Sequence, residues 1–114
     1  MYRFAPMYTY DATHSMTQGY GYGLATFIKL KSGSRDAFVE AMEKVAGAAC
    51  LSPGCIDYVV SGLRDDPESV FVIEFWRSDE DQRGALQSPA IMELIDYCNP
   101  LIDHFDQKPL VPLA

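Results

Sequence analysis

The sequence predicts one α+β domain in which helices cover a single face of an antiparallel sheet. The chain has 114 residues, which is enough for one hydrophobic core but not for two. Segments with a period of two, typical of strands, alternate with segments whose apolar residues recur every three or four positions, typical of helices. Turn-forming Ser, Pro, Gly and Asp residues separate these segments, so each can be assigned in order.

The chain begins with two different segments. Residues 1–19 have no steady period and are interpreted as an N-terminal arm, either a mobile leader or a segment laid over a partner subunit. Residues 20–30 alternate, with Leu24 and Ile28 on one side and Phe27 on the other, and this pattern predicts the first strand. The domain is therefore expected to span residues 20–114.

A helix is expected over residues 35–51. Ser32 or Ser34 can cap its start, and Pro53 and Gly54 follow its end. Its core-facing stripe consists of Phe38, Met42, Val45 and Ala49.

A hairpin should follow this helix. Residues 55–63 predict the second strand and residues 70–76 the third, with turn-forming residues at 64–69. The third strand is the strongest β signal in the chain, and its apolar run suggests burial on both faces. Alternation assigns one face to Phe71, Ile73 and Phe75 and the other to Val72, Glu74 and Trp76.

The last third of the chain predicts two short helices and a closing segment. Ser78, followed by three acidic residues, caps a helix that extends to about Gln87. Ser88 and Pro89 begin the next helix, and Asn99–Pro100 begins one last short turn. The apolar stripe of that second helix is Ile91, Leu94, Ile95 and Cys98. Pro109 and Pro112 restrict the segment 109–114 to an edge strand or an arm.

The order β, α, β, β, α, β is the split βαβ arrangement of ferredoxin-like folds. Its helices cover one face of the sheet, so the other face needs a partner. Because Phe71, Ile73 and Phe75 are too apolar to face water together, we expect a homodimer formed through this sheet face.

The composition excludes several classes of partner. Nine Lys and Arg against sixteen Asp and Glu give a net charge of −7, which disfavours binding to nucleic acid and to anionic membranes. The sequence has neither an apolar run of about 18 residues nor the basic and apolar start of a signal peptide. A cytoplasmic location is therefore expected.

The three cysteines and two histidines do not form a recognisable metal site. Cys50, Cys55 and Cys98 match neither a zinc ribbon nor a CxxC pair, and we interpret them as buried thiols. A Cys50–Cys55 bridge is an alternative that a reducing compartment disfavours. The histidines lack carboxylates at ligand spacing, and no Gly-rich phosphate loop is present, so no metal or cofactor is expected.

Four short motifs occur in an order that resembles the antibiotic biosynthesis monooxygenase family. They are Pro53-Gly54-Cys55, Asp65-Asp66-Pro67, the strand end at 72–78 with its Glu74-x-Trp76 pattern, and Ser88-Pro89. The resemblance covers about residues 24–110. It implies a dimeric α+β barrel with a pocket between sheet and helices, and it implies oxidation of anthrones, quinols or haem, often by molecular oxygen without metal or flavin. Other members of the family are isomerases or have no known reaction, so the family is a weak guide to chemistry.

The chain departs from the family pattern at two positions. Ala85 and Ala90 stand where many relatives carry histidine, so two possible proton-transfer groups are missing. The helical Trp and ligand His of the haem-degrading branch are also missing, and haem degradation is therefore not expected.

Glu74 and Trp76 are the candidate catalytic residues. A carboxylate in an apolar pocket has a raised pKa and could accept a phenolic or benzylic proton, although Glu74 could instead pair with Arg77, Lys29 or Arg64. The Trp76 indole could stack on a flat substrate and donate its N–H to a developing oxyanion, or it could only close the end of the sheet.

The candidate substrate-binding residues are Tyr58, Phe27 and Val72. Tyr58 could orient a substrate carbonyl, or its hydroxyl could lie at the sheet rim, and Phe27 could wall the pocket or belong to the core. His104 could act as a proton shuttle, but we interpret it as an exposed residue at a helix end, and His14 in the arm has no assigned role.

These residues favour a cofactor-independent monooxygenase that acts on a small aromatic, quinol or anthrone-like compound. Two alternatives stay open. One is a non-catalytic dimeric module for small-ligand binding or assembly, and the other is an isomerase on the same scaffold.

Overall fold

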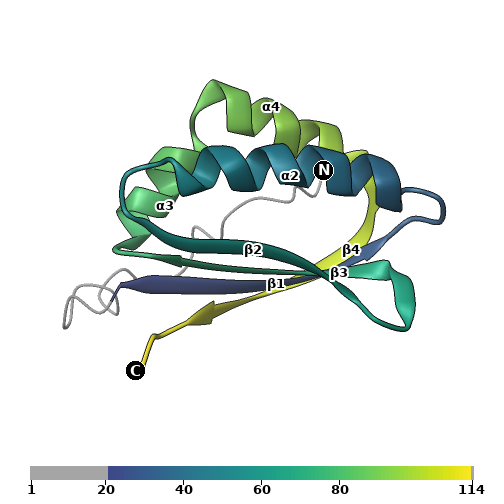
Figure 1. The fold of residues 1–114 in the computed structure, drawn as a ribbon, viewed down its shortest axis with the longest axis horizontal. Coiled ribbons are helices and arrows are strands. Elements are labelled where there is room, and N and C mark those ends of the chain that lie inside the picture. The colour runs from purple at the N-terminus through teal and green to yellow at the C-terminus, as the bar shows by residue number, and fades with distance from the viewer. Residues whose placement is uncertain (1–20, 114) are drawn as a thin grey trace.

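A computed structural model describes residues 21–113 and confirms the α+β, ferredoxin-like fold. The N-terminal arm lies outside the described residues. The elements are β1 (Tyr22–Leu30), α2 (Arg35–Cys50), β2 (Cys55–Leu63), β3 (Asp66–Trp76), α3 (Asp79–Leu86), α4 (Pro89–Cys98), the 3₁₀ turn η1 (Asn99–Leu101) and β4 (Ile102–Leu110). The four strands form one antiparallel sheet in the order β2-β3-β1-β4. Within residues 21–113, the three α-helices lie on one face of this sheet, as expected (Figure 1).

The register of the sheet places the candidate residues of β3 on the face covered by helices. Glu74 lies between Leu24 of β1 and Tyr58 of β2. Two positions earlier on β3, Val72 is fully buried in the core. The helical side of the core comes from the predicted stripes, which are buried at Phe38, Met42, Val45 and Ala49 of α2 and at Ile91, Ile95 and Cys98 of α4.

The opposite face of the sheet carries the other set of β3 side chains. Phe71, Ile73 and Phe75 are half-buried there, so β3 is not buried on both faces within the described chain. Phe27 pairs with Phe71, their ring centroids are 5.8 Å apart, and the two rings meet edge to face. The expectation that Phe27 walls a pocket near Glu74, or belongs to the core, is therefore wrong, because strand alternation turns its 44% exposed ring away from the helices.

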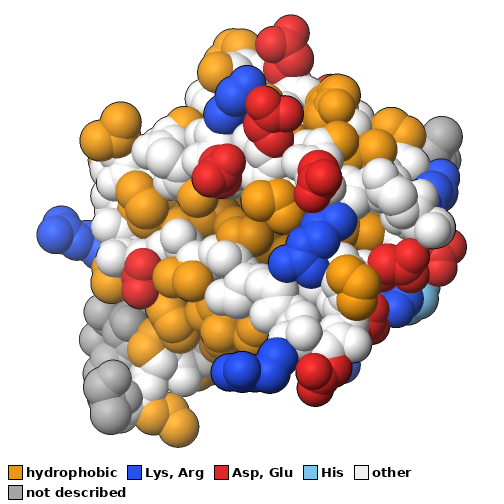
Figure 2. Space-filling view, turned by 45° about the vertical axis from the view of Figure 1, so that its right-hand side comes forward, with side chains coloured by type: hydrophobic (Ala, Val, Ile, Leu, Met, Phe, Trp, Pro, Cys, Tyr) orange, Lys and Arg blue, Asp and Glu red, His pale blue; other side chains and the backbone are white. Residues whose placement is uncertain are grey.

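Apolar side chains are also visible at the surface of the space-filling molecule. In the view of Figure 2 they gather through the middle and lower part of the molecule, and charged side chains surround them. Exposed large apolar residues on strands include Phe27, Ile56, Val59 and Leu63. In the part of the chain that the structure describes, the opposite side of the sheet has no helical layer over it (Figure 1).

β3 begins four residues earlier than the sequence predicts, at Asp66. The Asp66 carboxylate accepts hydrogen bonds from the backbone N–H of Glu68 and from the Ser69 hydroxyl. It thereby holds the Asp-Pro segment, which has low intrinsic strand propensity, in the hairpin with β2.

The final strand lies earlier in the chain than expected. β4 spans Ile102–Leu110 and pairs with β1 at the edge of the sheet, whereas the prediction placed the closing element at 109–114. The polar residues around His104 did not predict a strand, because one face of an edge strand is solvated. The strand forms there because the segment pairs with β1, which is distant in the sequence. His104 is consequently an exposed residue on a strand, and its interpretation as a helix-end residue is wrong.

The starts of the two short helices follow the sequence signals. The Ser78 hydroxyl accepts a hydrogen bond from the backbone N–H of Asp81 at 3.1 Å, and the Ser88 hydroxyl accepts one from Ile91 at 3.4 Å. Ser34 occupies the N-cap of α2 but makes no side-chain capping bond. Within the described chain, none of the helices has the length and apolar content needed to cross a membrane.

Candidate functional site

Glu74 is a carboxylate in the interior of the protein. It lies near the end of β3 on the helical face of the sheet, and only 4% of its surface is exposed. Its cross-strand neighbours are Leu24 on β1 and Tyr58 on β2, and both of these are buried. The site is therefore a region of low polarity built around one acidic group.

Two neutral donors hold the Glu74 carboxylate. The Trp76 indole donates its Nε1–H to Glu74 Oε1 at 2.9 Å, and the Gln82 amide donates from Nε2 to the same oxygen at 3.0 Å. Trp76 follows Glu74 by two positions on the same strand face, while Gln82 belongs to α3. The cluster of Glu74, Trp76 and Gln82 thus ties the end of β3 to α3.

The environment of Glu74 favours its neutral form. Burial raises the pKa of Glu74, and the hydrogen bonds from Gln82 and Trp76 offset part of that effect by stabilising the charged form. No Lys or Arg within residues 21–113 forms an ion pair with this carboxylate. A buried acid that is held by neutral donors is suited to take up and release a proton.

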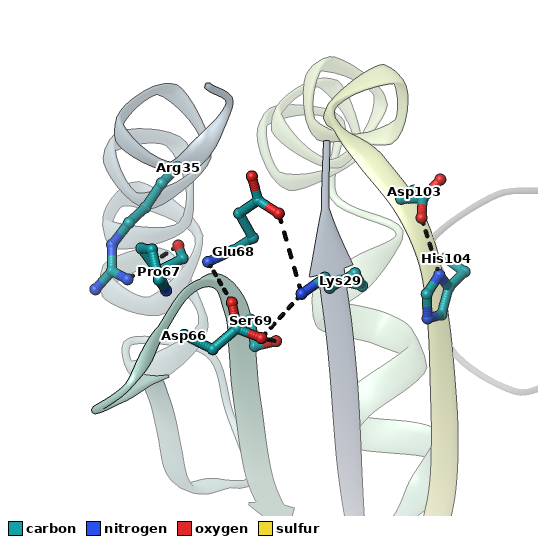
Figure 3. Close-up of polar contacts among 8 residues, drawn as sticks. All are labelled: Lys29, Arg35, Asp66, Pro67, Glu68, Ser69, Asp103 and His104. Carbon is teal, nitrogen blue, oxygen red and sulfur yellow. Dashed lines mark hydrogen bonds and ion pairs between the residues drawn. The ribbon is translucent and has the colours of Figure 1, made fainter. Parts of the chain in front are cut away.

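Lys29, which could have paired with Glu74, instead lies on the other face of the sheet. Its ammonium binds Asp66 at 2.9 Å and approaches Glu68 at 4.0 Å. Figure 3 shows Lys29 pointing toward these two carboxylates. The expectation of an ion pair between Lys29 and Glu74 is therefore wrong. Alternation along β1 turns Lys29 to the face opposite that of Leu24, the cross-strand neighbour of Glu74.

The position of Trp76 changes the role expected for it. Its side chain is completely buried, and its N–H is already bonded to Glu74. The donor that was expected to stabilise a substrate oxyanion is therefore used within the protein. In this arrangement Trp76 orients the carboxylate and lowers the cost of its ionisation.

Tyr58 lies against Glu74 from the neighbouring strand. It is 6% exposed, so the expectation of a hydroxyl at the sheet rim is wrong. Burial raises the pKa of Tyr58 well above its ordinary value, and the negative charge of Glu74 raises it further. Tyr58 therefore stays neutral at physiological pH and can act as a hydrogen-bond donor. Val72, the third predicted substrate-binding residue, is a fully buried core side chain.

Gln82 is the site residue that sequence reasoning missed. It is 1% exposed and shares the buried side of α3 with Asp79, Ala85 and Leu86. That spacing of three and four residues was readable from the sequence, and a polar residue on a buried stripe requires a partner. The identity of the partner, eight residues earlier on a different element, was not readable.

The three cysteines surround the same region. All three contribute electrostatically to the raised pKa of Tyr58. Cys98 is buried, and burial raises its pKa to about 11, whereas Cys55 is half-buried and Cys50 is exposed. The expectation of three buried thiols is therefore wrong for Cys50, which ends α2 at the surface.

A separate cavity lies at the junction of α4, η1 and β4. Its volume is about 540 Å³, and its lining includes Lys31, Asp96, Pro100, Ile102, His104 and Phe105. His104 Nδ1 lies 3.1 Å from the Asp103 carboxylate, and Figure 3 shows this pair on β4. His104 is thus brought to a cavity, but not to Glu74. Among residues 21–113, no group of three or more His, Cys, Asp or Glu side chains is arranged to hold a metal ion.

Comparison with known proteins identifies the family of this fold. Residues 22–96 match the profile of the family described as antibiotic biosynthesis monooxygenase. A protein of Chloroflexus aurantiacus J-10-fl, provisionally named an antibiotic biosynthesis monooxygenase, is 30% identical, with a TM-score of 0.74 over 82% of this chain and 93% of its own. No match was found among curated proteins.

Two more distant structures share the fold alone. A Nitrosomonas europaea protein with the same provisional name is 18% identical, with a TM-score of 0.79 over 84% of this chain and 93% of its own. A conserved protein from Methanosarcina mazei Go1 is 16% identical, with a TM-score of 0.74 over 86% of this chain and 99% of its own.

Proposed function

Because the chain belongs to the antibiotic biosynthesis monooxygenase family, we propose that it is a cofactor-independent monooxygenase for a small aromatic, quinol or anthrone-like compound. The observation that carries the proposal is the Glu74 carboxylate, which is buried, has a raised pKa and is held only by neutral N–H donors among the described residues. Such a group meets the main requirement of this reaction, a base for a weakly acidic C–H or O–H.

The proposed reaction begins with transfer of a benzylic or phenolic proton to Glu74. The resulting carbanion or its enolate form passes one electron to molecular oxygen, and the two radicals combine into a peroxide anion. This anion recovers a proton from Glu74, and the hydroperoxide loses water to leave a carbonyl group. A CH₂ group and O₂ thus become a C=O group and H₂O, with one oxygen atom in each product.

The protein supplies orientation and electrostatics to this sequence of steps. Trp76, on the same strand as Glu74, fixes Oε1, so in the proposal Oε2 takes the proton. Tyr58, which is neutral and close to Glu74, donates a hydrogen bond to the substrate oxygen. Since Glu74 is nearly inaccessible, α3 shifts away from the sheet to admit the substrate and carries Gln82 with it.

The proposed assembly is a homodimer in which two sheets meet face to face. Phe71, Ile73 and Phe75 are half-buried on the face that lacks helices, and Phe27 extends this apolar surface. Pairing with a second copy would remove these rings from water and leave the Glu74 side of each sheet under its own helices.

Oxygen consumption with a panel of quinols and anthrones tests the proposal. We expect uptake of O₂, incorporation of one ¹⁸O atom from labelled oxygen into the product, and a fall in turnover of roughly 10²–10⁴-fold for Glu74→Gln. Glu68→Gln, which removes a carboxylate from the far end of the sheet, is the matched control and should keep its activity.

The outcomes separate the proposal from its rivals. Full turnover in both Glu74→Gln and Trp76→Phe would contradict the assigned site. Conversion of a substrate without oxygen uptake would instead indicate an isomerase.

A second candidate function is small-ligand binding without catalysis. It is favoured by the cavity of about 540 Å³, which lies between α4 and β4 and does not include Glu74 in its lining. In this case apolar ligands should raise the melting temperature of the protein, and His104→Ala should weaken that effect while Glu74→Gln leaves it unchanged. If the protein is instead a monooxygenase acting at Glu74, Glu74→Gln should weaken the effect of the ligand and His104→Ala should leave it unchanged.

A further inference from the structure

Cys50 and Cys55 face each other across a short, ordered turn. Cys50 is the last residue of α2 and Cys55 is the first residue of β2. Between them the backbone N–H of Leu51 bonds to Ala48, that of Ser52 bonds to Ala49 at 2.9 Å, and the N–H of Cys55 returns to the Ser52 carbonyl at 3.3 Å. These bonds reverse the chain so that the two thiols become neighbours, and the Cys50 thiol acts electrostatically on that of Cys55.

The turn is also held from outside. The Gly54 carbonyl accepts a hydrogen bond from the backbone N–H of Arg77 at 2.8 Å. Gly54 has a φ of +83°, and the Asp81 side chain occupies the space where a Cβ would stand. The turn is therefore fixed against the start of α3, and the cysteines at its two ends have little freedom to separate.

We propose that Cys50 and Cys55 are a thiol-modification site that forms a reversible intramolecular disulfide when the protein meets hydrogen peroxide. The inference does not depend on the proposed monooxygenase activity. It rests on the proximity of the two thiols, on their unequal exposure, and on a turn that keeps them together.

The two cysteines have different roles in this reaction. Cys50 is exposed and meets the oxidant first, so its thiol takes one oxygen atom from hydrogen peroxide to form a sulfenic acid, and the other oxygen leaves as water. Cys55 is half-buried, and burial raises its pKa to about 11, with the neighbouring Cys50 as the next cause. It therefore remains a protonated thiol and acts second.

The second step closes the bridge. The Cys55 sulfur attacks the Cys50 sulfenic acid, an S–S bond forms, the S–O bond breaks, and the hydroxyl leaves as water with the Cys55 proton. In total, two thiols and one hydrogen peroxide become one disulfide and two waters. Because the partner thiol is on the same turn, its effective concentration is high, and closure should outpace oxidation to sulfinic acid.

The bridge would form at the border of the Glu74 cluster. Cys55 is the cross-strand partner of Trp76, and both Cys50 and Cys55 contribute to the electrostatic environment of Tyr58. Trp76 is the only tryptophan in the chain. Because a disulfide quenches the fluorescence of a nearby indole, oxidation should be visible as a loss of Trp76 emission.

Treatment of the full-length protein with one equivalent of hydrogen peroxide tests the inference. We expect the intact mass to fall by about 2 Da, thiol alkylation of the denatured protein to drop from three sites to one, and peptide mapping to join the segments that contain Cys50 and Cys55. Dithiothreitol should restore both the mass and the Trp76 emission. Cys98→Ser should behave like the wild type, since Cys98 is buried on α4.

Two single variants provide the contrasting outcomes. Cys50→Ser should lose the fluorescence change and the mass loss, and Cys55→Ser should accumulate sulfenic and then sulfinic acid on Cys50. The inference is overturned if the wild type gains about 32 Da as sulfinic acid, or if Cys50 instead links two molecules in a dimer on a non-reducing gel.

Discussion

Glu74 illustrates how the surroundings of a single residue decide its chemistry. An exposed glutamate at the end of a strand would be ionised at physiological pH. Here the core removes water from the carboxylate, and two N–H groups replace only part of the lost solvation. The result is a carboxyl group that keeps its proton to a higher pH than its exposed counterparts, and this property is measurable even before a substrate is known.

Replacement of Glu74 by Gln should change how stability depends on pH. The pKa of Glu74 in the folded state is raised above its ordinary value of 4.5. Between pH 4.5 and the raised pKa, the folded protein therefore holds more protons than the unfolded chain, and its stability falls as the pH rises. The glutamine of the variant would keep an oxygen acceptor for Trp76 and Gln82 without a charge. Urea denaturation should therefore show Glu74→Gln gaining stability relative to the wild type as the pH rises above 4.5.

The control for this experiment is Glu40→Gln, because Glu40 is exposed on α2. This variant should keep the pH slope of the wild type. An unchanged slope in Glu74→Gln would show that the carboxylate is not desolvated in solution.

Asp66 shows the opposite behaviour. The hydrogen bond with Lys29 is the main cause that lowers the pKa of Asp66 to about 2, and the Ser69 hydroxyl and the Glu68 N–H add to it. Its stabilising contribution is present above the ordinary pKa of 3.8 and is lost as pH falls toward about 2. Acid titration of stability should therefore show a shallower loss in Asp66→Asn than in the wild type, whereas Asp103→Asn, at an exposed carboxylate, should match the wild type.

At the scale of elements, the site depends on how α3 is attached to the sheet. α3 has only eight residues, and its start is fixed by the Ser78 cap, by the Arg77–Gly54 backbone bond and by the packing of Asp81 against Gly54. These contacts bring Gln82 over Glu74. The turn between α2 and β2 therefore positions a residue of a third element.

Gly54→Ala should loosen this attachment. Both Gly54 and Gly33 have positive φ, so an alanine at either position costs about 1–2 kcal/mol of backbone strain. At Gly33 the added methyl meets open space, but at Gly54 it overlaps Asp81, and this crowding adds roughly 1–3 kcal/mol. Thermal or urea denaturation of the two variants separates the effects.

A larger loss for Gly54→Ala than for Gly33→Ala is the expected order. Equal losses of stability in the two variants would mean that the Asp81 side chain moves aside at no energetic cost, and that the turn does not hold α3 in place.

At the scale of the whole molecule, the sheet separates two environments. One face lies under three helices and holds the Glu74 cluster. The other face carries the phenyl rings of β1 and β3, and no helix among the described residues covers it (Figure 1). In the proposed homodimer, a second copy related by two-fold symmetry would cover this apolar face with identical residues.

A charge placed at the centre of this face should prevent pairing. Phe71→Asp would bury an uncompensated carboxylate between two sheets, so we expect light scattering after gel filtration to show a dimer for the wild type and a monomer for the variant. Leu51→Asp changes an apolar residue that is exposed away from the sheet and should remain dimeric. A monomeric wild type would contradict the proposed assembly.

The sequence by itself determined the element order, the starts of α3 and α4, and the shared face of Glu74 and Trp76. These features follow from local signals, namely strand alternation, helical periodicity and capping side chains such as Ser78 and Ser88. Such signals act over a few residues and need no knowledge of distant partners.

Only the tertiary structure decided which face of β3 lies under the helices. It thereby also decided whether Phe27, Lys29 and Tyr58 lie on the same side of the sheet as Glu74. It also made Gln82 a partner of Glu74, engaged the Trp76 N–H and formed β4 from a polar run beside β1. These outcomes depend on strand pairing and on contacts between elements that are remote in the chain. Alternation alone sorts side chains into two faces, but only packing determines which of those faces is dry.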